Sequence, residues 1–440
     1  MRRLVQRILH PLFLRTPRVR TWAFAVLDLA ARPVLLFFRL DKPPSNAAGA
    51  AALEARGDEF NAAAETYYAE RANPAELMAK PFSEPEALAR RFIDVGVLID
   101  GLRLQPGDTV LELGAGTCWL SHFLNKFGCR TIAIDVSASA LSMGRTVFER
   151  DPQTNWQLNP QFLTYDGHTL PIPSATVDRI VLYDAYHHLP NAAQLMREMR
   201  RVLAPEGIVG MSEPGRGHAM SRPSLAETEA TGVLENELVL EEIGELALSC
   251  GFAAARVLVA TRPPVFEVEA ADLRRFMGGK GFSRYWQALS AGLDGHHYIL
   301  LFVGDPVPTT RRPKLLRARL ASASGARLQQ GKSQTLTVSM HNAGDTRWLS
   351  AEHAPGWTRL GGHLYRVLDG QVDRPLVDFD WLRVALPSDV APDETVRLSV
   401  QLPPIERPGE YLVAFDLVIE GVAWFADRGS TPVEIPCQVV

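Results

Sequence analysis

Cysteine is scarce in this sequence. The 440 residues contain four, scattered without the paired spacing of a zinc site or the regular pattern of a disulfide framework. This scarcity argues against a small disulfide-rich secreted fold and favours a reducing compartment. His296 and His297 are adjacent, but no partners at ligand spacing accompany them. The sequence therefore predicts no metal site, and it predicts a cytoplasmic protein.

An uninterrupted apolar run long enough to cross a membrane is also missing. The most apolar stretch, residues 22–40, is broken by Asp28, Arg32 and Pro33. A spanning helix needs about 20 largely apolar residues, so these interruptions argue against a span. No clean apolar core precedes a small-residue cleavage site, which argues against a secretory signal.

Positive charge is concentrated at the N-terminus. Residues 1–45 carry nine Lys or Arg and two Asp, a net charge of +7, mixed with Leu, Val, Phe and Trp. Basic amphipathic segments bind the surface of anionic membranes, so we expect peripheral contact with the inner face of a membrane here. A helical hairpin packed on the protein itself is the alternative. The rest of the chain carries −11, which disfavours nucleic-acid binding.

The most informative stretch runs from Val110 to Thr117 and reads Val-Leu-Glu-Leu-Gly-Ala-Gly-Thr. Its apolar residues predict a buried parallel strand, and its glycines let the backbone turn sharply and approach a ligand. Helical spacing resumes at Trp119, so a strand, a glycine turn and a helix N-terminus follow one another, as in nucleotide-type sites. A dinucleotide is disfavoured, because Trp119 replaces the third glycine of that fingerprint and Glu112 would repel a pyrophosphate.

This stretch resembles motif I of the class I S-adenosylmethionine-dependent methyltransferases. The resemblance implies S-adenosylmethionine as cofactor, bound over the turn of Gly114, Ala115 and Gly116. It also implies that Glu112 supports the methionine end, which carries an ammonium group. The family usually has a further glycine where Cys118 stands, a departure of little consequence for this prediction.

Acidic residues end the apolar strands that follow, and the resemblance covers roughly residues 95–260. Asp135 ends the second strand, where a carboxylate can accept both ribose hydroxyls. Asp166 ends the third strand and, by the resemblance, binds the adenine amino group. Tyr183 and Asp184 end the fourth strand. The expected cofactor-binding residues are Glu112, Gly114, Ala115, Gly116, Asp135, Val136, Asp166, Gly167, Tyr183 and Asp184.

Two histidines directly follow the fourth strand. Methyl transfer from a sulfonium to oxygen is an in-line displacement, which requires positioning of both reactants and removal of a proton from the acceptor. A histidine suits that role, so His187 and His188 are the candidate catalytic bases. In the resembled family a histidine of this turn often only shapes the pocket, and that alternative stays open. Glu213 and His218 follow the fifth strand and are expected near the same pocket.

Periodicity predicts an α/β fold over residues 46–305, a Rossmann-like, doubly wound sheet of seven strands. Helices over 46–100 precede this core and are expected to close over the cofactor, with Tyr67 and Tyr68 as lid candidates. An insertion over 261–296 separates the sixth and seventh strands. Its size and place suit substrate selection, with a peripheral helix as the alternative.

Beyond a proline-punctuated linker at 306–315, the periodicity changes to two. Residues 316–440 alternate in several short strands separated by turn signals, which predicts an all-β, immunoglobulin-like sandwich. Segments around Trp348 and Trp424 resemble those of sandwich domains attached to bacterial polysaccharide enzymes and O-antigen exporters. That resemblance implies a glycan partner for this domain.

Together these features predict an S-adenosylmethionine-dependent methyltransferase that O-methylates a sugar hydroxyl of a cell-surface polysaccharide or glycolipid. An acceptor carried on a lipid agrees with the basic segment 1–45. Two alternatives remain. One is an enzyme that methylates a small lipophilic acceptor such as a quinone or lipid, and the other is a cofactor-binding but non-catalytic module of polysaccharide assembly.

Overall fold

The computed structural model describes residues 52–70, 73–260, 269–275, 282–322, 326–367 and 375–440. The basic segment expected at 1–45 lies outside these residues, as do 261–268 and 276–281 of the expected insertion. The chain divides into two compact units between Val303 and Gly304. Among the described residues, no helix combines the length and the apolar content that a membrane crossing requires.

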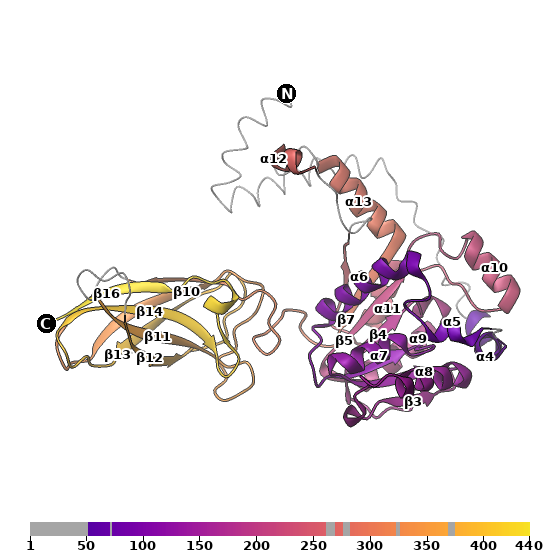
Figure 1. Ribbon diagram of the computed structural model, residues 1–440, viewed down its shortest axis with the longest axis horizontal. Helices are drawn as coiled ribbons and strands as arrows, with labels where there is room; N and C mark the ends of the chain where they lie inside the picture. Colours follow the sequence, from indigo (N-terminus) through magenta and orange to yellow (C-terminus); the bar gives the residue numbers. More distant parts are fainter. Residues whose placement is uncertain (1–51, 71–72, 261–268, 276–281, 323–325, 368–374) are drawn as a thin grey trace. The chain divides into compact units, whose positions relative to one another are not determined.

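The first unit is built on one sheet of seven strands in the order β3-β2-β1-β4-β5-β7-β6 (Figure 1). Strands β1 to β5 run parallel, and β7 runs antiparallel to β5 and β6. The doubly wound α/β fold expected from the sequence is therefore confirmed. The strand order reverses at β1 and β4, which opens a crevice at their carboxyl ends. The strands are β1 Thr109–Leu113, β2 Arg130–Asp135, β3 Gln161–Thr164, β4 Val177–Tyr183, β5 Leu203–Pro214, β6 Ala254–Leu258 and β7 His296–Phe302.

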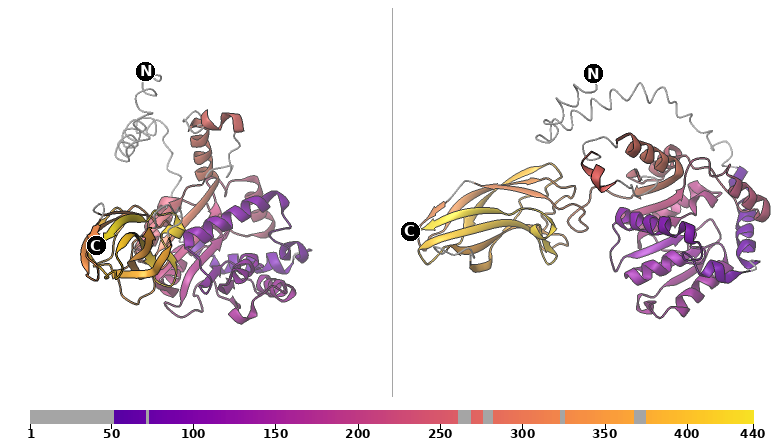
Figure 2. Two further views of the ribbon diagram at one scale, coloured as in Figure 1. Left: turned by 60° about the vertical axis from the view of Figure 1, so that its left-hand side comes forward. Right: turned by 45° about the horizontal axis from the view of Figure 1, so that its top comes forward.

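Helices cover both faces of this sheet, as the views in Figure 2 show. Helices α6 and α7 share one core cluster with Val110, whereas α9 and α11 share another with Leu111 and Leu113. Neighbouring residues of one strand thus enter opposite cores, which explains the continuous apolar runs of the sequence. The helices are α4 Gly57–Ala69, α5 Pro74–Met78, α6 Pro85–Leu102, α7 Trp119–Phe127, α8 Ala138–Arg150, α9 Ala192–Val202, α10 Arg222–Thr231, α11 Leu240–Ser249, α12 Leu273–Arg275 and α13 Phe282–Gly295.

The insertion between β6 and β7 contains helices α12 and α13 within the described residues. Helix α13 packs against β7, and Arg274, Arg275 and Tyr285 are exposed. None of the insertion's described residues lines the cavity at the carboxyl ends of β1 and β4. Its role in substrate selection therefore stays a prediction.

The second unit contains two sheets that share one hydrophobic core. The smaller sheet has the order β13-β10-β8, and the larger has the order β12-β11-β14-β16-β9 with β15 beside β14. Val338 of the smaller sheet and Phe415 of the larger one enter the same core as the fully buried Trp348. The strands are β8 Ala318–Ser322, β9 Ala326–Leu328, β10 Gln334–Asn342, β11 Thr358–Val367, β12 Leu376–Ala385, β13 Thr395–Leu402, β14 Gly409–Ile419, β15 Ala423–Trp424 and β16 Val433–Val439.

The linker expected at 306–315 belongs to this second unit. Thr310 is buried, and its hydroxyl donates to the carbonyl of Gly356 at 2.6 Å. The backbone N–H of Arg347 donates to the carbonyl of Pro308 at 2.8 Å. The composition predicted a linker here, and these hydrogen bonds attach parts of it to the second unit.

Candidate active site

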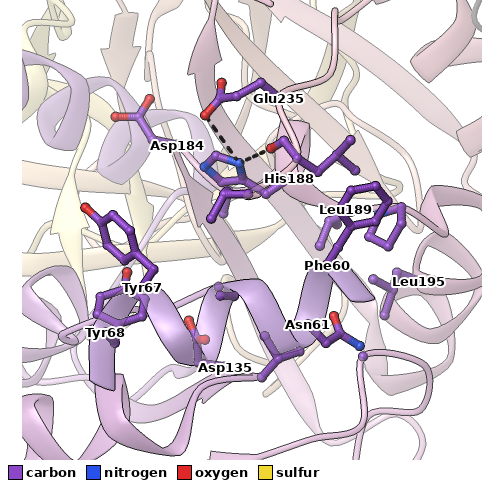
Figure 3. A pocket seen from close by; sticks show the side chains of 18 of the residues that line it. Phe60, Asn61, Tyr67, Tyr68, Asp135, Asp184, His188, Leu189, Leu195 and Glu235 are labelled. Atoms are coloured by element: carbon purple, nitrogen blue, oxygen red, sulfur yellow. Dashed lines mark hydrogen bonds and ion pairs between the residues drawn. The ribbon is translucent and has the colours of Figure 1, made fainter. Parts of the chain in front are cut away.

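A cavity of about 350 Å³ lies at the carboxyl ends of β1, β2 and β4, under helix α4 (Figure 3). This volume falls in the range of small-molecule sites. Six of the twelve predicted site residues line it, namely Gly114, Asp135, Val136, Gly167, Asp184 and His188. The other six stand outside its lining, namely Glu112, Ala115, Gly116, Asp166, Tyr183 and His187.

The glycine turn depends on positive φ angles that glycine adopts most readily. Gly114 has φ +74° and Gly116 has φ +51°. A Cβ on Gly114 would lie 2.7 Å from the Cβ of Ala185, and one on Gly116 would lie 2.7 Å from the hydroxyl oxygen of Tyr68. Both positions therefore favour glycine in conformation, and a side chain on either would also crowd a neighbour.

Asp135 ends β2 inside the cavity with a buried carboxylate. One oxygen accepts the N–H of Gly116 at 2.7 Å, and the other accepts the N–H of Ser137 at 2.9 Å. Burial raises the pKa of Asp135, although these hydrogen bonds oppose the shift. A carboxylate has about four acceptor directions, so each oxygen keeps a lone pair for a ligand hydroxyl. This geometry suits the ribose contact predicted for Asp135, with Val136 beside it on the wall.

Glu112 lies outside the cavity, in the core. Its carboxylate is buried and accepts the backbone N–H and the hydroxyl of Ser121 at 2.8 and 2.5 Å. Burial raises the pKa of Glu112 to about 8. The reason for this placement is strand alternation, because Leu111 and Leu113 face one core and Glu112 faces the side of α7. Glu112 therefore fixes the first turn of α7, and its support of the methionine end of the cofactor stays a prediction.

Asp166 and Gly167 follow β3 in a turn at the rim of the cavity. The exposed Asp166 carboxylate accepts the N–H groups of Thr169 and His168 at 2.7 and 2.8 Å, which lowers its pKa. Gly167 lines the cavity, and its carbonyl accepts a hydrogen bond from the Asn191 amide at 2.8 Å. The Asp166 carboxylate thus shapes the turn, and its contact with adenine stays a prediction.

Tyr183 and Asp184 face different parts of the first unit. The Tyr183 hydroxyl donates to the buried Asp94 carboxylate at 2.7 Å, so this side chain stabilises the core beside α6. Asp184 lines the cavity, and Arg90 lies 3.9 Å from its carboxylate. Burial and the nearby Glu213 raise the pKa of Asp184 to about 6, so the group is mostly ionised at pH 7. A carboxylate in this position suits a cationic part of a ligand.

Helix α4 covers the cavity, as Figure 3 shows. Glu65 joins this helix to the N-terminus of α8, because its two oxygens accept the hydroxyls of Ser137 and Ser139 at 2.6 and 2.5 Å. Burial raises the pKa of Glu65, but these hydrogen bonds outweigh it and the pKa is lowered. The lid position predicted for the two tyrosines agrees with the lining residues from α4, which are Phe60, Asn61, Ala64, Tyr67 and Tyr68.

The two candidate bases occupy different places. His188 lines the cavity, and its Nδ1 lies 2.6 Å from the carbonyl oxygen of Leu234. Since a carbonyl only accepts, Nδ1 carries the hydrogen and Nε2 keeps a lone pair. His187 is buried outside the lining, and its Nδ1 donates to the Glu213 carboxylate at 2.7 Å. Of the two histidines, His188 is the one placed to meet an acceptor in the cavity.

One wall of the cavity comes from a segment that sequence reasoning did not single out. Val233, Leu234 and Glu235 follow α10 and line the cavity next to His188. A carboxylate of Glu235 lies 3.7 Å from Nδ1 of His188 and 2.7 Å from Nε2 of His218. The sequence signal for Glu235 was an acid directly after two apolar residues. Its spacing could not connect it with the turn of His187 and His188, which lies far away in the sequence.

Comparison with known proteins shows what the segment around the cavity is similar to. Residues 111–211 match a family described as a methyltransferase domain. An uncharacterized 37.1 kDa protein in transposon TN4556 of Streptomyces fradiae is 30% identical over 188 residues, which cover 40% of this chain and 52% of that protein. A demethylmenaquinone methyltransferase of Corynebacterium efficiens is 25% identical over 197 residues, which cover 44% of this chain and 77% of that protein.

A probable S-adenosylmethionine-dependent methyltransferase of Mycobacterium tuberculosis is 27% identical over 153 residues, which cover 34% of this chain and 52% of that protein. The chain thus spans about half the length of the first and third of these relatives. A solved structure of Haemonchus contortus phosphoethanolamine N-methyltransferase 2 with S-adenosyl-L-methionine has a TM-score of 0.34 at 18% identity, covering 48% of this chain and 51% of that one. The matched segment 111–211 contains the glycine turn, Asp135, Asp184 and both candidate histidines.

Proposed function

We propose that this chain, which carries a class I S-adenosylmethionine-dependent methyltransferase domain, methylates a sugar hydroxyl of a cell-surface polysaccharide or glycolipid. One observation carries the proposal of catalysis. A single cavity brings together the Asp135 carboxylate, suited to a ribose, and His188, whose Nε2 keeps a lone pair. When bound, S-adenosylmethionine supplies a methyl group activated by its sulfonium.

The residues that line the cavity have separate roles in binding the cofactor, excluding water and removing the proton. Asp135 holds the ribose hydroxyls, and Asp184 offers its negative charge to the cationic end of the cofactor. Tyr67 and Tyr68 of the lid exclude water from the cavity. Nε2 of His188 accepts the proton of the acceptor hydroxyl as the new C–O bond forms and the bond between the methyl carbon and the sulfur breaks to leave a neutral thioether. Nδ1–H of His188 stays on its carbonyl partner throughout.

The sandwich supplies the glycan contact in this proposal. His363, Phe379 and Trp424 form an aromatic patch in which Phe379 lies 4.4 Å from His363 and 5.5 Å from Trp424 between ring centroids. Phe379 is 52% exposed, and the guanidinium of Arg383 lies over the Trp424 ring. An exposed ring near one guanidinium suits the C–H face and the hydroxyls of a sugar.

A small lipophilic acceptor such as a quinone is the second candidate. The demethylmenaquinone methyltransferase of Corynebacterium efficiens favours it, since that relative matches 44% of this chain.

We also propose that residues 1–45 bind the surface of a membrane, which agrees with either acceptor. Deletion of 1–45 should abolish binding to anionic vesicles, and equal binding of the full and shortened chains would contradict the membrane contact.

Cofactor binding and turnover of the full chain test the proposal. Calorimetric titration with S-adenosylmethionine and its demethylated product should show binding that Asp135→Ala abolishes. His188→Ala should keep this binding but lose methyl transfer from labelled cofactor to sugar acceptors, whereas Glu149→Ala on the surface of α8 should change neither. Transfer to quinones alone would favour the second candidate. Binding without transfer to any acceptor would favour the non-catalytic module, and no binding by folded protein would overturn the proposal.

A further inference from the structure

Five ionisable side chains gather beside the cavity from three segments of the first unit. The turn after β4 contributes His187 and His188, and the end of β5 and the loop after it contribute Glu213 and His218. The segment after α10 contributes Glu235. His187 is 3% exposed and Glu213 is fully buried, so this is not a solvated group of surface charges. Three imidazoles and two carboxylates gathered in this way are the donor set of a metal site.

The carboxylate of Glu235 lies at the centre of the cluster. Its Oε2 is 2.7 Å from Nε2 of His218 and 3.8 Å from Nε2 of His187. This oxygen is buried and forms an ion pair with His218, but it meets no partner at regular hydrogen-bond geometry. A buried carboxylate between two imidazoles is a donor arrangement that a divalent ion can bridge once the three side chains adjust around it.

Glu213 prepares His187 for such a role. Its carboxylate accepts Nδ1–H of His187 at 2.7 Å and also accepts the backbone N–H groups of Ala185 and Tyr186 at 3.1 and 2.9 Å. These bonds fix the carboxylate, and the carboxylate fixes the tautomer of His187 with its lone pair on Nε2. A carboxylate–histidine pair of this kind commonly orients the histidine ligands of protein metal sites.

We propose that His187, His218 and Glu235 bind a divalent first-row transition ion such as Zn²⁺, with Glu213 as the orienting group. His188 is also within reach, since the ligand atoms of His187, His188 and Glu235 lie within 4.8 Å of one another. We assign His188 the role of catalytic base and not of metal ligand, because its Nδ1, the nitrogen nearer to Glu235, already donates to the Leu234 carbonyl. Two histidines and one carboxylate leave coordination positions open, as in catalytic metal sites.

The role of this metal site in catalysis rests on the proposed function, and the site makes the proposed acceptor more specific. Glu235 lines the cavity, so the open positions of the ion face the space next to His188. An ion there binds an acceptor through two neighbouring oxygens and lowers the pKa of the hydroxyl that loses its proton to His188. The favoured acceptor class is therefore a vicinal diol, as found on many sugars, over an isolated hydroxyl.

The experiment measures metal binding without turnover. The full chain is stripped with a chelator, titrated with Zn²⁺ in a competition assay, and loaded with Co²⁺ to record the visible absorption of the bound ion. We expect one equivalent bound by the native protein and an affinity about 100-fold lower in His218→Gln and Glu235→Gln. His218 is partly exposed, so its variant is expected to fold. His168→Gln, directly after the lining residue Gly167 and outside the cluster, is the matched control and should bind like the native chain.

Each result decides between clear alternatives. No stoichiometric metal binding by a chain that still binds S-adenosylmethionine overturns the metal site and leaves the proposed function intact. Stoichiometric binding unchanged in both cluster variants places the ion elsewhere and also overturns it. Stoichiometric binding that both variants lose, in a chain that does not bind the cofactor, supports the metal site and contradicts the proposed function.

Discussion

The hydroxyl oxygen of Tyr68 lies 2.7 Å from the point that a Cβ of Gly116 would occupy. Lid and glycine turn are therefore in contact, and a methyl group added to the turn must move the lid. We expect Gly116→Ala to weaken S-adenosylmethionine binding about tenfold by calorimetry. Gly107→Ala is the control, because that glycine also has a positive φ but no neighbour within 4 Å.

A second substitution separates the clash from backbone strain. Adding Tyr68→Phe to Gly116→Ala removes the crowded oxygen and leaves the ring carbon, Cζ, at 3.6 Å. The double variant should recover part of the lost affinity for S-adenosylmethionine. The part that it does not recover measures the backbone strain of a side chain at φ +51°. If the double variant is no better than Gly116→Ala, the contact with the lid is not the cause.

The hydrogen bonds of Glu65 should control how tightly the lid closes. Glu65→Ala removes bonds to the hydroxyls of Ser137 and Ser139, so α4 loses its link to α8. We expect faster hydrogen exchange over Gly57–Ala69 and cofactor affinity lower by about fivefold, since charged hydrogen bonds contribute about 1.5–3 kcal/mol when buried and this one is partly solvated. Glu59→Ala removes only an exposed pair with Arg56, and an equal effect there would refute the assignment.

The glycine turn, the strand-end carboxylates and the sheet could be predicted from the sequence because each follows from short-range patterns. Asp135 could be placed because the carboxyl end of a parallel strand lies at the ligand-binding edge of such a sheet. The motif shows that Glu112 is acidic, but the alternation of β1 decides which face its side chain takes, so its contact with Ser121 could not be predicted and its contact with the cofactor stays a prediction. His187 and His188 could not be told apart, since the partners that separate them, Glu213 and Leu234, come from distant segments.

Stability should depend on pH through Glu112. Its pKa is raised to about 8 in the folded chain from an ordinary value of 4.5, so the folded protein holds this proton more tightly than the unfolded one. Stability is therefore highest below pH 4.5 and falls as the pH rises toward 8. Glu112→Gln keeps an oxygen for Ser121 but cannot ionise, and it should stabilise the cofactor-free chain above pH 8 by up to about 5 kcal/mol.

Denaturant unfolding between pH 5 and 9 measures this effect of Glu112. The expected signature is a stability difference between variant and native chain that grows with pH and levels off near pH 8. A constant difference across this range would mean that Glu112 is ionised throughout in the folded protein. Glu149→Gln, on the exposed side of α8, supplies the control for a surface carboxylate.

Sugar binding by the sandwich should depend on the exposed ring of its aromatic patch. Residues 304–440 form a compact unit with its own core, so the fragment can be tested alone. We expect it to bind bacterial polysaccharides on an array, and Phe379→Ala to weaken that binding about fivefold, since an aromatic contact contributes roughly 0.5–1.5 kcal/mol beyond its buried area. Leu376→Ala removes exposed apolar surface from the same strand without removing a ring, so it should bind like the native fragment. Equal affinity in Phe379→Ala would exclude the patch as the glycan contact and would favour the lipophilic acceptor.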